Sequence, residues 1–442
     1  MLATNLEDEF LQKKLWRAII ETPTALKGFS LPSRLCIQPM NCYDSLNGIP
    51  SKITYERYRR FAQSGAGLII VEQTLVGPTD ERKPNNLRLT QKNSAAIKKL
   101  VDIVRNENSS CKLIFHVNML MPCLNGKPYE NIHLLTKGDI SNIICHFIEA
   151  ANVLYQSGAD GIEIKLCHHA LLMSFIEPLN ERNDEYGGSL DNRLRIVEKI
   201  IIGIRQRISD EKFKIGIRLS MYNHIKGGMG TISSDSDVED LTEPLLILEK
   251  CAKAGVELFN ISMGNSVFTP KMITPAKLPD TFSLSNLESF DMFRYAGIAK
   301  KYLIKQGYPH VMIIGSGFST CKEMLPDIMA ANLLKGNMDL VGIGRQALID
   351  CDIQHILSGN FIPCKGDTAC AYISIDRYQI PVGCIHKKPY STLLKMIQGG
   401  PVEEIDETYI LLIKNSLKST SQKTKKRLSD FIGRYNLYKE GI

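Results

Sequence analysis

Residues 156–164 read QSGADGIEI, in which a glycine leads directly into an apolar run that contains β-branched residues. The same order returns in QSGAGLII at 63–70, KAGVELFNI at 253–261 and LKGNMDLVGI at 334–343. Glycine readily adopts the left-handed conformation that commonly ends a helix. We therefore expect a turn from helix to buried strand at Gly65, Gly158, Gly255 and Gly336.

Eight short apolar segments follow one another along the chain. They are Leu35–Met40, Gly67–Gln73, Lys112–Asn118, Gly161–Leu166, Lys214–Ser220, Glu257–Gly264, Val311–Gly317 and Asp339–Arg345. Near-continuous apolar runs are typical of parallel strands buried on both faces, and helical patterns lie between them. Eight such units predict an α/β fold, the (β/α)8 TIM barrel. The alternative, an open doubly wound sheet, requires G-x-G-x-x-G after its first strand, and this motif does not follow Leu35–Met40.

The alternation of strand and helix segments covers only the middle of the chain and so divides it into three parts. Residues 1–33 form an N-terminal leader that is expected to cap the bottom of the barrel, and residues 34–360 form the barrel. Residues 361–442 form a C-terminal extension with scattered cysteines and a basic tail. The apolar pattern of the extension predicts one or two helices and no core of their own.

The composition is that of a globular protein, since 44% of the 442 residues are hydrophobic and 23% are charged. The N-terminus mixes charges of both signs, and no window holds the ~18 apolar residues of a membrane span, so neither a signal peptide nor a membrane partner is expected. The twelve cysteines are too sparse for a secreted disulfide framework. They are typical of reduced thiols in a cytoplasmic protein.

The net charge of +7 is concentrated at one end of the chain. Between Ile410 and Ile442, eight lysines and arginines oppose two acidic residues, which leaves the tail with +6 of the total. The nearly neutral barrel gives no reason to expect a nucleic-acid partner. The tail is expected to be a solvated helix face, or alternatively a docking element for an acidic protein.

Functional side chains of a TIM barrel lie at the carboxyl ends of its strands. Glycine-rich turns follow the last two strands here, at Gly315-Ser316-Gly317 and at Gly344-Arg345. Their backbone N–H groups and the Arg345 guanidinium suit a phosphate, although glycines also serve tight connections without any ligand.

A lysine and two histidines mark the end of the fourth strand. Lys165 shares a face with Glu163, and His168 and His169 follow the strand. Lys165 and His168 together suit an oxygen that gains negative charge during a reaction. The alternative is a Lys165–Glu163 ion pair beside two solvent-facing histidines.

The stretch from Glu163 to Arg193 ends in DEYGGSLDNR and strongly resembles the signature of the Old Yellow Enzyme family of FMN-dependent oxidoreductases. Further matches are LPSR at 31–34, Pro39-Met40, GLIIVE at 67–72 and Gly344-Arg345. The resemblance is greatest to the barrel domain of the branch with 2,4-dienoyl-CoA reductase and trimethylamine dehydrogenase. It implies an NAD(P)H:flavin oxidoreductase with a small-molecule substrate.

The resemblance also implies where FMN lies. The flavin ring is expected near Pro39, Met40, Asn41 and Gln73. His116 stands where the family has glutamine at the pyrimidine edge, and Arg218 matches the cation beside flavin N1 and O2. The phosphate is expected on Gly315, Ser316, Gly317, Gly344 and Arg345.

Two catalytic positions depart from the family pattern. Ene reductases hold a substrate carbonyl with a His pair or a His/Asn pair, whereas Lys165 replaces the first member here and His168 keeps the second. Ala170 stands where many members have a tyrosine acid. Tyr43 is the remaining candidate acid, the alternative being a tyrosine packed under its loop. The predicted catalytic residues are therefore His168, Lys165 and Tyr43, acting on an enone-like or other activated acceptor.

The cysteines after the eighth strand depart as well. Multidomain relatives bind a [4Fe–4S] cluster through four cysteines, whereas this chain offers Cys364, Asp367, Cys370 and Cys384 at stretched spacing. We expect a degenerate site without a cluster, and no other metal.

The electron donor is expected to be NAD(P)H, bound directly over the flavin. The stretch after Tyr390 is too short for the two dinucleotide-binding domains that multidomain relatives carry. One alternative is a flavin dehydrogenase that passes electrons to a separate partner protein, and another is a catalytically altered FMN-binding component of a larger assembly. Many members of the family associate, so the resemblance is also compatible with a homo-oligomer.

Overall fold

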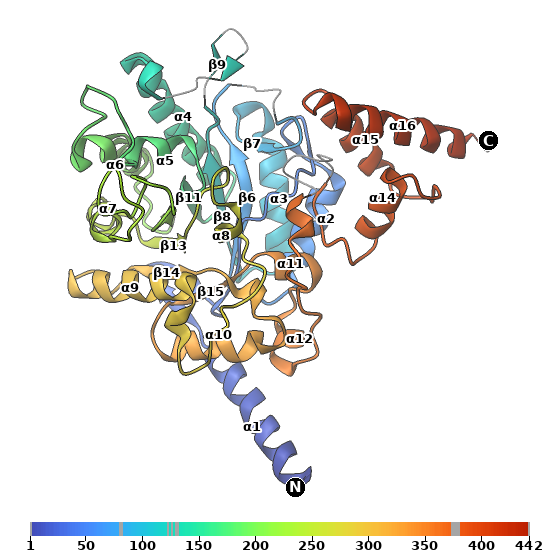
Figure 1. The fold of residues 1–442 in the computed structure, drawn as a ribbon, viewed down its shortest axis with the longest axis horizontal. Coiled ribbons are helices and arrows are strands. Elements are labelled where there is room, and N and C mark those ends of the chain that lie inside the picture. Colours follow the sequence, from blue (N-terminus) through green and yellow to red (C-terminus); the bar gives the residue numbers. More distant parts are fainter. Residues whose placement is uncertain are drawn as a thin grey trace.

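A closed barrel of eight parallel strands forms the centre of the computed structural model, which describes residues 2–78, 83–121, 123–124, 127–128, 132–372 and 381–440 (Figure 1). The strands are β3 (Leu35–Ile37), β6 (Leu68–Leu75), β8 (Lys112–Asn118), β11 (Gly161–Leu166), β12 (Lys214–Ser220), β13 (Leu258–Ser262), β14 (Met312–Gly315) and β15 (Leu340–Ile343). Each overlaps one of the predicted segments. Because β3 pairs with both β15 and β6, the sheet closes and the TIM barrel is confirmed.

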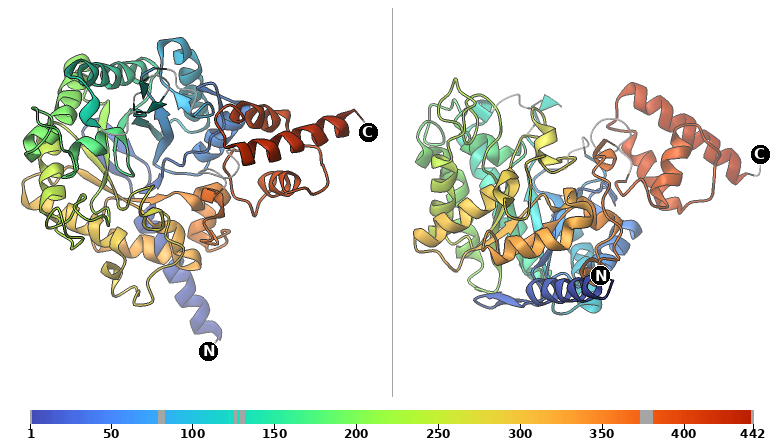
Figure 2. Two further views of the ribbon diagram at one scale, coloured as in Figure 1. Left: turned by 45° about the horizontal axis from the view of Figure 1, so that its top comes forward. Right: turned by 60° about the horizontal axis from the view of Figure 1, so that its bottom comes forward.

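Helices cover the outside of this barrel (Figure 2). They are α2 (Lys52–Ala62), α3 (Ser94–Glu107), α4 (Lys137–Gln156), α6 (Leu190–Arg207), α7 (Thr242–Lys253), α9 (Asp291–Lys305), α10 (Leu325–Leu334), α11 (Arg345–Ile349) and α12 (Ile353–Ser358). Their apolar faces and the outward side chains of the strands form one continuous core. The four junction glycines have positive φ, from 65° at Gly336 to 108° at Gly255, which confirms the predicted turns.

Residues before β3 close the amino-terminal end of the barrel. Helix α1 (Leu2–Ile20) packs on α10, where Trp16 donates a hydrogen bond to Asp327 Oδ1 at 2.9 Å. Strands β1 (Thr24–Leu26) and β2 (Phe29–Leu31) form a hairpin whose apolar side chains join the inward-facing ones of the barrel strands in a buried cluster. This apolar plug lies at the end of the barrel opposite the carboxyl ends of the strands.

Helices α14 (Tyr390–Ile397), α15 (Glu407–Ser416) and α16 (Gln422–Lys439) form a bundle next to α2 (Figures 1 and 2). Its members bury a cluster around Leu393, Leu412, Leu428 and Phe431, all 0% exposed. The expectation of one or two helices without a core was wrong. Each helix contributes only a few apolar residues, and the core exists only when the three faces meet.

Short elements occupy the connecting loops. They are β4 (Ser45–Leu46), β5 (Ile49–Pro50), β7 (Leu87–Arg88), β9 (Cys123–Leu124), β10 (Lys127–Pro128), α5 (Leu171–Ile176), α8 (Pro270–Ile273) and α13 (Ala369–Tyr372). In the described part of the chain, no helix has both the length and the apolar character needed to cross a bilayer.

Candidate active site

Polar side chains line the lumen near the carboxyl ends of the strands. His116 Nδ1 on β8 lies 2.5 Å from Glu163 Oε1 on β11, and Glu163 Oε2 accepts from Asn260 Nδ2 on β13 at 2.9 Å. Asn260 also exchanges hydrogen bonds with Gln38, which follows β3. Burial lowers the pKa of His116 to about 4 in spite of the neighbouring Glu163. His116 is therefore neutral near pH 7, with its proton on Nδ1 and with Nε2 left as an acceptor.

One extra residue in β6 sets the direction of two neighbouring side chains. The pairing register with β8 shifts between Val71 and Thr74, so β6 has one residue more than its partner over this stretch. Such a β-bulge re-aims side chains beside it. Gln73 consequently points into the mouth of the barrel, and Glu72 points toward α2.

Gln73 links two other strands at the mouth. Its Oε1 accepts from Lys165 Nζ on β11 at 2.6 Å and from Asn118 Nδ2 on β8 at 3.2 Å. With the oxygen occupied, the amide N–H groups of Gln73 remain as donors.

Lys165 and Arg218 place two positive charges side by side. They are register partners on β11 and β12 and therefore project from the same face of the sheet. Lys165 does not form the ion pair with Glu163 that the alternative interpretation foresaw, because Glu163 pairs with His116 instead. The buried Nε of Arg218 has no hydrogen-bond partner among the described residues. Burial lowers the pKa of Lys165, and the charge of Arg218 acts in the same direction.

The two histidines after β11 differ in their surroundings. His168 Nε2 lies 2.7 Å from Ser262 Oγ at the end of β13. Burial, aided by Arg218, holds the pKa of His168 well below its usual range. His169 is exposed and meets the Phe268 ring edge-on. Of the pair, only His168 belongs to the mouth.

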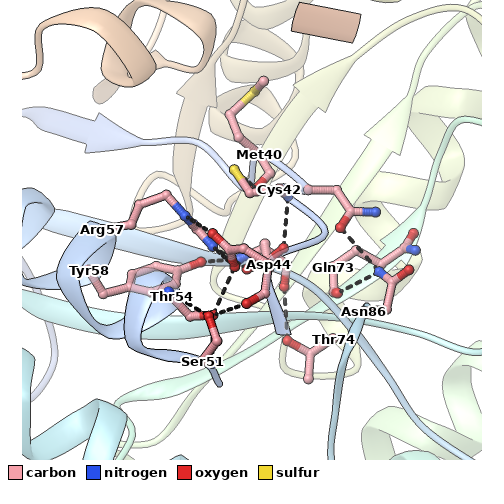
Figure 3. Close-up of polar contacts among 12 residues, drawn as sticks. Met40, Cys42, Asp44, Ser51, Thr54, Arg57, Tyr58, Gln73, Thr74 and Asn86 are labelled. Atoms are coloured by element: carbon pink, nitrogen blue, oxygen red, sulfur yellow. Dashed lines mark hydrogen bonds and ion pairs between the residues drawn. The ribbon is translucent and has the colours of Figure 1, made fainter. Parts of the chain in front are cut away.

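A buried ion network holds the loop that follows β3 (Figure 3). Arg57 on α2 donates to both carboxylate oxygens of Asp44, from Nε at 2.9 Å and from Nη2 at 2.8 Å, and it also pairs with Glu72. Glu72 Oε2 accepts from the backbone N–H of Cys42 at 2.8 Å. The three charged side chains are at most 5% exposed. The network therefore fixes the loop of residues 39–44 beside the mouth.

The loop residues predicted for the ring and the acid rest on this support. Asn41 Oδ1 accepts from Asn86 Nδ2 at 3.1 Å. Tyr43 has φ 50° and packs against a buried cluster that contains Leu348 and Val382. This is the packing contact that the alternative interpretation of Tyr43 foresaw, and its role as an acid stays a prediction.

The turns after β14 and β15 supply the predicted phosphate residues. Gly317 has φ 94°, and a Cβ there would lie 2.7 Å from the Phe290 ring, so a side chain is excluded. Arg345 follows Gly344 and is only 7% exposed. Its Nη2 donates to Pro275 O at 2.6 Å, whereas its buried Nη1 has no partner in the described part of the chain. An unpartnered buried guanidinium N–H beside a glycine turn suits an anion.

The candidate cluster ligands Cys364, Cys370, Cys384 and Asp367 border a cavity of about 20 Å³. Asp367 is hydrogen-bonded by His386, and burial raises the pKa of Cys370 to about 12. Among the residues that the structure describes, no three His, Cys, Asp or Glu side chains are arranged to hold a metal ion. That the chain lacks an iron–sulfur cluster stays a prediction.

Several of these contacts were missed in the sequence. Arg57 lies in KITYERYRR, where nothing but its place on the apolar face of the helix separates it from the other arginines. Asp44 lies in a loop, and its pairing with Arg57 depends on the tertiary fold. Gln38 and Asn260 could have been noticed, since each is a polar residue inside an apolar strand segment.

Comparisons with known proteins identify the family of the chain. The family model described as "NADH:flavin oxidoreductase / NADH oxidase family" matches residues 20–256, just over half of the chain. A putative 12-oxophytodienoate reductase 2 of Oryza sativa subsp. japonica is 29% identical in an alignment 226 residues long, which covers 46% of this chain and 59% of the relative. A metal reductase of Desulforamulus reducens is 25% identical in an alignment 391 residues long, which covers 83% of this chain and 53% of the relative.

A solved complex of 2-naphthoyl-CoA reductase shares the fold. It superposes with a TM-score of 0.66 at 18% identity, over 81% of this chain and 55% of that one. The chain thus spans little more than half the length of these proteins. The family match itself includes the DEYGGSLDNR stretch and the first five barrel strands. The chain therefore belongs to the NADH:flavin oxidoreductase / NADH oxidase family, the Old Yellow Enzyme family that this stretch indicated.

Proposed function

We propose that the chain binds FMN at the mouth of the barrel and acts as an NAD(P)H-dependent oxidoreductase on a small activated acceptor. The observation that carries the proposal is that Arg218 and Arg345 each keep a buried guanidinium nitrogen without a partner among the described residues. Arg218 lies on β12 and Arg345 follows the turn after β15, and two strands, β13 and β14, separate β12 from β15. FMN needs one cation at its phosphate and another at its pyrimidine edge, which becomes negative on reduction.

The residues at the mouth divide into three groups in this proposal. The phosphate is held by Arg345 and by the backbone of Gly315, Ser316, Gly317 and Gly344. The ring lies against Pro39, Met40 and Asn41, with Gln73 as a donor. The pyrimidine edge meets Arg218 and the acceptor Nε2 of His116. Bound FMN would supply two-electron transfer between NAD(P)H and the acceptor.

Lys165 and His168 are proposed to hold the acceptor's oxygen. Among the described residues, Lys165 uses one N–H for Gln73, which leaves two N–H groups for the acceptor. A neutral His168 whose Nε2 accepts from Ser262 carries its proton on Nδ1, which is then available to the acceptor. Tyr43 is proposed to supply the proton that the product gains, because Ala170 has none to give.

The test is the visible spectrum of the purified protein, before and after anaerobic addition of NADH or NADPH. Flavin absorbance that is bleached by either nucleotide supports the proposal. Bound flavin that neither nucleotide bleaches supports the alternative, a dehydrogenase with a separate electron-acceptor protein or a catalytically altered FMN-binding component of an assembly. A protein that neither contains FMN nor binds added FMN refutes the proposal.

A further inference from the structure

A second cavity, distinct from the barrel mouth, lies between α2 and the C-terminal helical bundle. Its volume is about 210 Å³. One wall is apolar and aromatic, with Ile53 from α2, Leu348 from α11 and the rings of Tyr390 and Tyr409. The two rings meet edge-on, with centroids 5.8 Å apart. The space suits a ligand body about the size of one ring.

The other wall is basic. Arg57 and Arg60 from α2 line it together with Lys387 and Lys388, while Glu56 is the acidic residue among the described lining. Arg57 is neutralised by Asp44 and Glu72, so the surplus charge comes from the other three cations.

These three cations have no acidic partner in the part of the chain that the structure describes. Arg60 Nη2 donates to Ala347 O at 3.1 Å and Lys387 Nζ to Ile349 O at 2.9 Å, both of which are uncharged acceptors. Glu56 is already paired with Arg59. Like charges around one cavity repel each other unless a counter-charge enters it.

Two guanidinium nitrogens at this wall also lack hydrogen bonds. Arg57 Nη1 and Arg60 Nε are buried and have no partner among the described residues. The Arg57 side chain is only 5% exposed, and a buried donor without an acceptor is costly. An anionic oxygen would satisfy both the charge and the donors.

We propose that this cavity binds a small organic anion, with one carboxylate or phosphate head group on an apolar body of about one ring. The head group lies against Arg60, Lys387 and Lys388, and the body lies between Ile53 and the two tyrosines. The site is separate from the proposed flavin site and takes no part in the proposed reaction.

Isothermal titration calorimetry of the full chain, as purified, tests the site with benzoate and phenyl phosphate as probes. Benzamide, which has the same ring and no charge, is the control ligand. We expect saturable binding of at least one anionic probe and at least tenfold weaker binding of benzamide. If neither anion binds, or if benzamide binds equally well, the proposal is wrong.

Variants that each remove one charged side chain show where on the protein the anion binds. Lys388→Gln should weaken the anion about fivefold and Arg60→Gln at least tenfold, whereas Glu56→Gln should tighten it about twofold. Lys388 and Glu56 are exposed, so their variants should fold even if Arg60→Gln does not. Lys426→Gln, in a different basic hollow on α16, is the matched control and should bind as the unmodified protein does. Binding that responds to Lys165→Gln and not to Lys388→Gln would place the anion at the barrel mouth and overturn the proposal.

Discussion

Lys165 Nζ donates a hydrogen bond to Gln73 Oε1 over 2.6 Å, and this contact joins β11 to β6 across the intervening β8. It couples the cation proposed for the acceptor's oxygen to the amide proposed for the flavin ring. It also fixes the orientation of the Gln73 amide, because the oxygen faces Lys165 and the nitrogen faces away. The position where the family has a histidine thus gains a charge and a structural tie.

Replacing Lys165 by Gln should lower kcat/KM for a carbonyl acceptor by roughly 10- to 100-fold, the effect of losing a hydrogen bond from a charged donor. The bound flavin should be retained, because Lys165 is not among the proposed cofactor contacts. Steady-state kinetics with NAD(P)H, together with the flavin content, measure both quantities. Lys199→Gln on α6, which removes a hydrogen bond to Tyr186 and lies outside the proposed site, is the control. Equal rates in the two variants would rule out the proposed role.

Arg345→Gln should weaken FMN binding by roughly 10- to 100-fold, because the phosphate loses a charge-assisted hydrogen bond. Equilibrium dialysis of the FMN-free protein measures the affinity. Arg205→Gln, at a partly exposed ion pair with Glu257, should bind FMN normally.

Arg218→Gln should instead make the reduction potential of the bound flavin more negative, since the reduced ring loses a neighbouring cation. A potential that moves in Arg345→Gln and not in Arg218→Gln would reverse the assignment of the two arginines.

Arg57→Met should destabilise the fold by about 3–5 kcal/mol, because it leaves the carboxylates of Asp44 and Glu72 buried without their cation. Urea unfolding measures the change. Arg59 lies two residues away on the same helix and pairs with exposed or partly exposed partners, so Arg59→Met should cost at most about 1 kcal/mol. Similar losses in both variants would mean that the network contributes no more than a surface ion pair.

His116→Gln should change how stability depends on pH. The pKa of His116 is about 4 in the fold and 6.5 without it, so the unfolded chain takes up the proton first as the pH falls. The free energy of unfolding therefore drops below pH 6.5, and by pH 5 this histidine should account for roughly 2 kcal/mol of the loss. The variant lacks the histidine, so its free energy of unfolding should not fall by this amount between pH 7 and pH 5. Urea unfolding of both proteins at pH 7 and pH 5 measures the difference, and parallel curves would contradict the prediction.

Much of the fold could be predicted because its signals are local. The apolar strand runs and the glycines at 65, 158, 255 and 336 each depend on neighbouring residues alone, and the structure has all eight strands and all four turns. The C-terminal core was missed because Leu393, Leu412 and Phe431 come from three short helices, and nothing in any one of them shows the others.

The site residues also divide into those with a local sequence signal and those whose contacts depend on the tertiary fold. Lys165, His168 and Arg218 could be placed at the mouth because each stands at the end of a recognisable strand. The tie from Lys165 to Gln73 and the pair of Arg57 with Asp44 could not, because they join segments whose spacing is set by the closed barrel. The register shift in β6 leaves no mark in LIIVEQTL, since an added residue in a strand looks like any other.

That shift makes the length of β6 as important as its composition. Deleting a single codon between those for Val71 and Thr74 would remove the bulge and leave a regular strand. The two side chains that now point toward α2 and toward the mouth would then be replaced by whichever residues fall at those places in the regular alternation. The support of the 39–44 loop and the amide at the mouth would then be lost together, although every other side chain of the site remained in place. Gene variants in this short stretch should therefore tolerate many exchanges of one residue for another and very few changes in residue number.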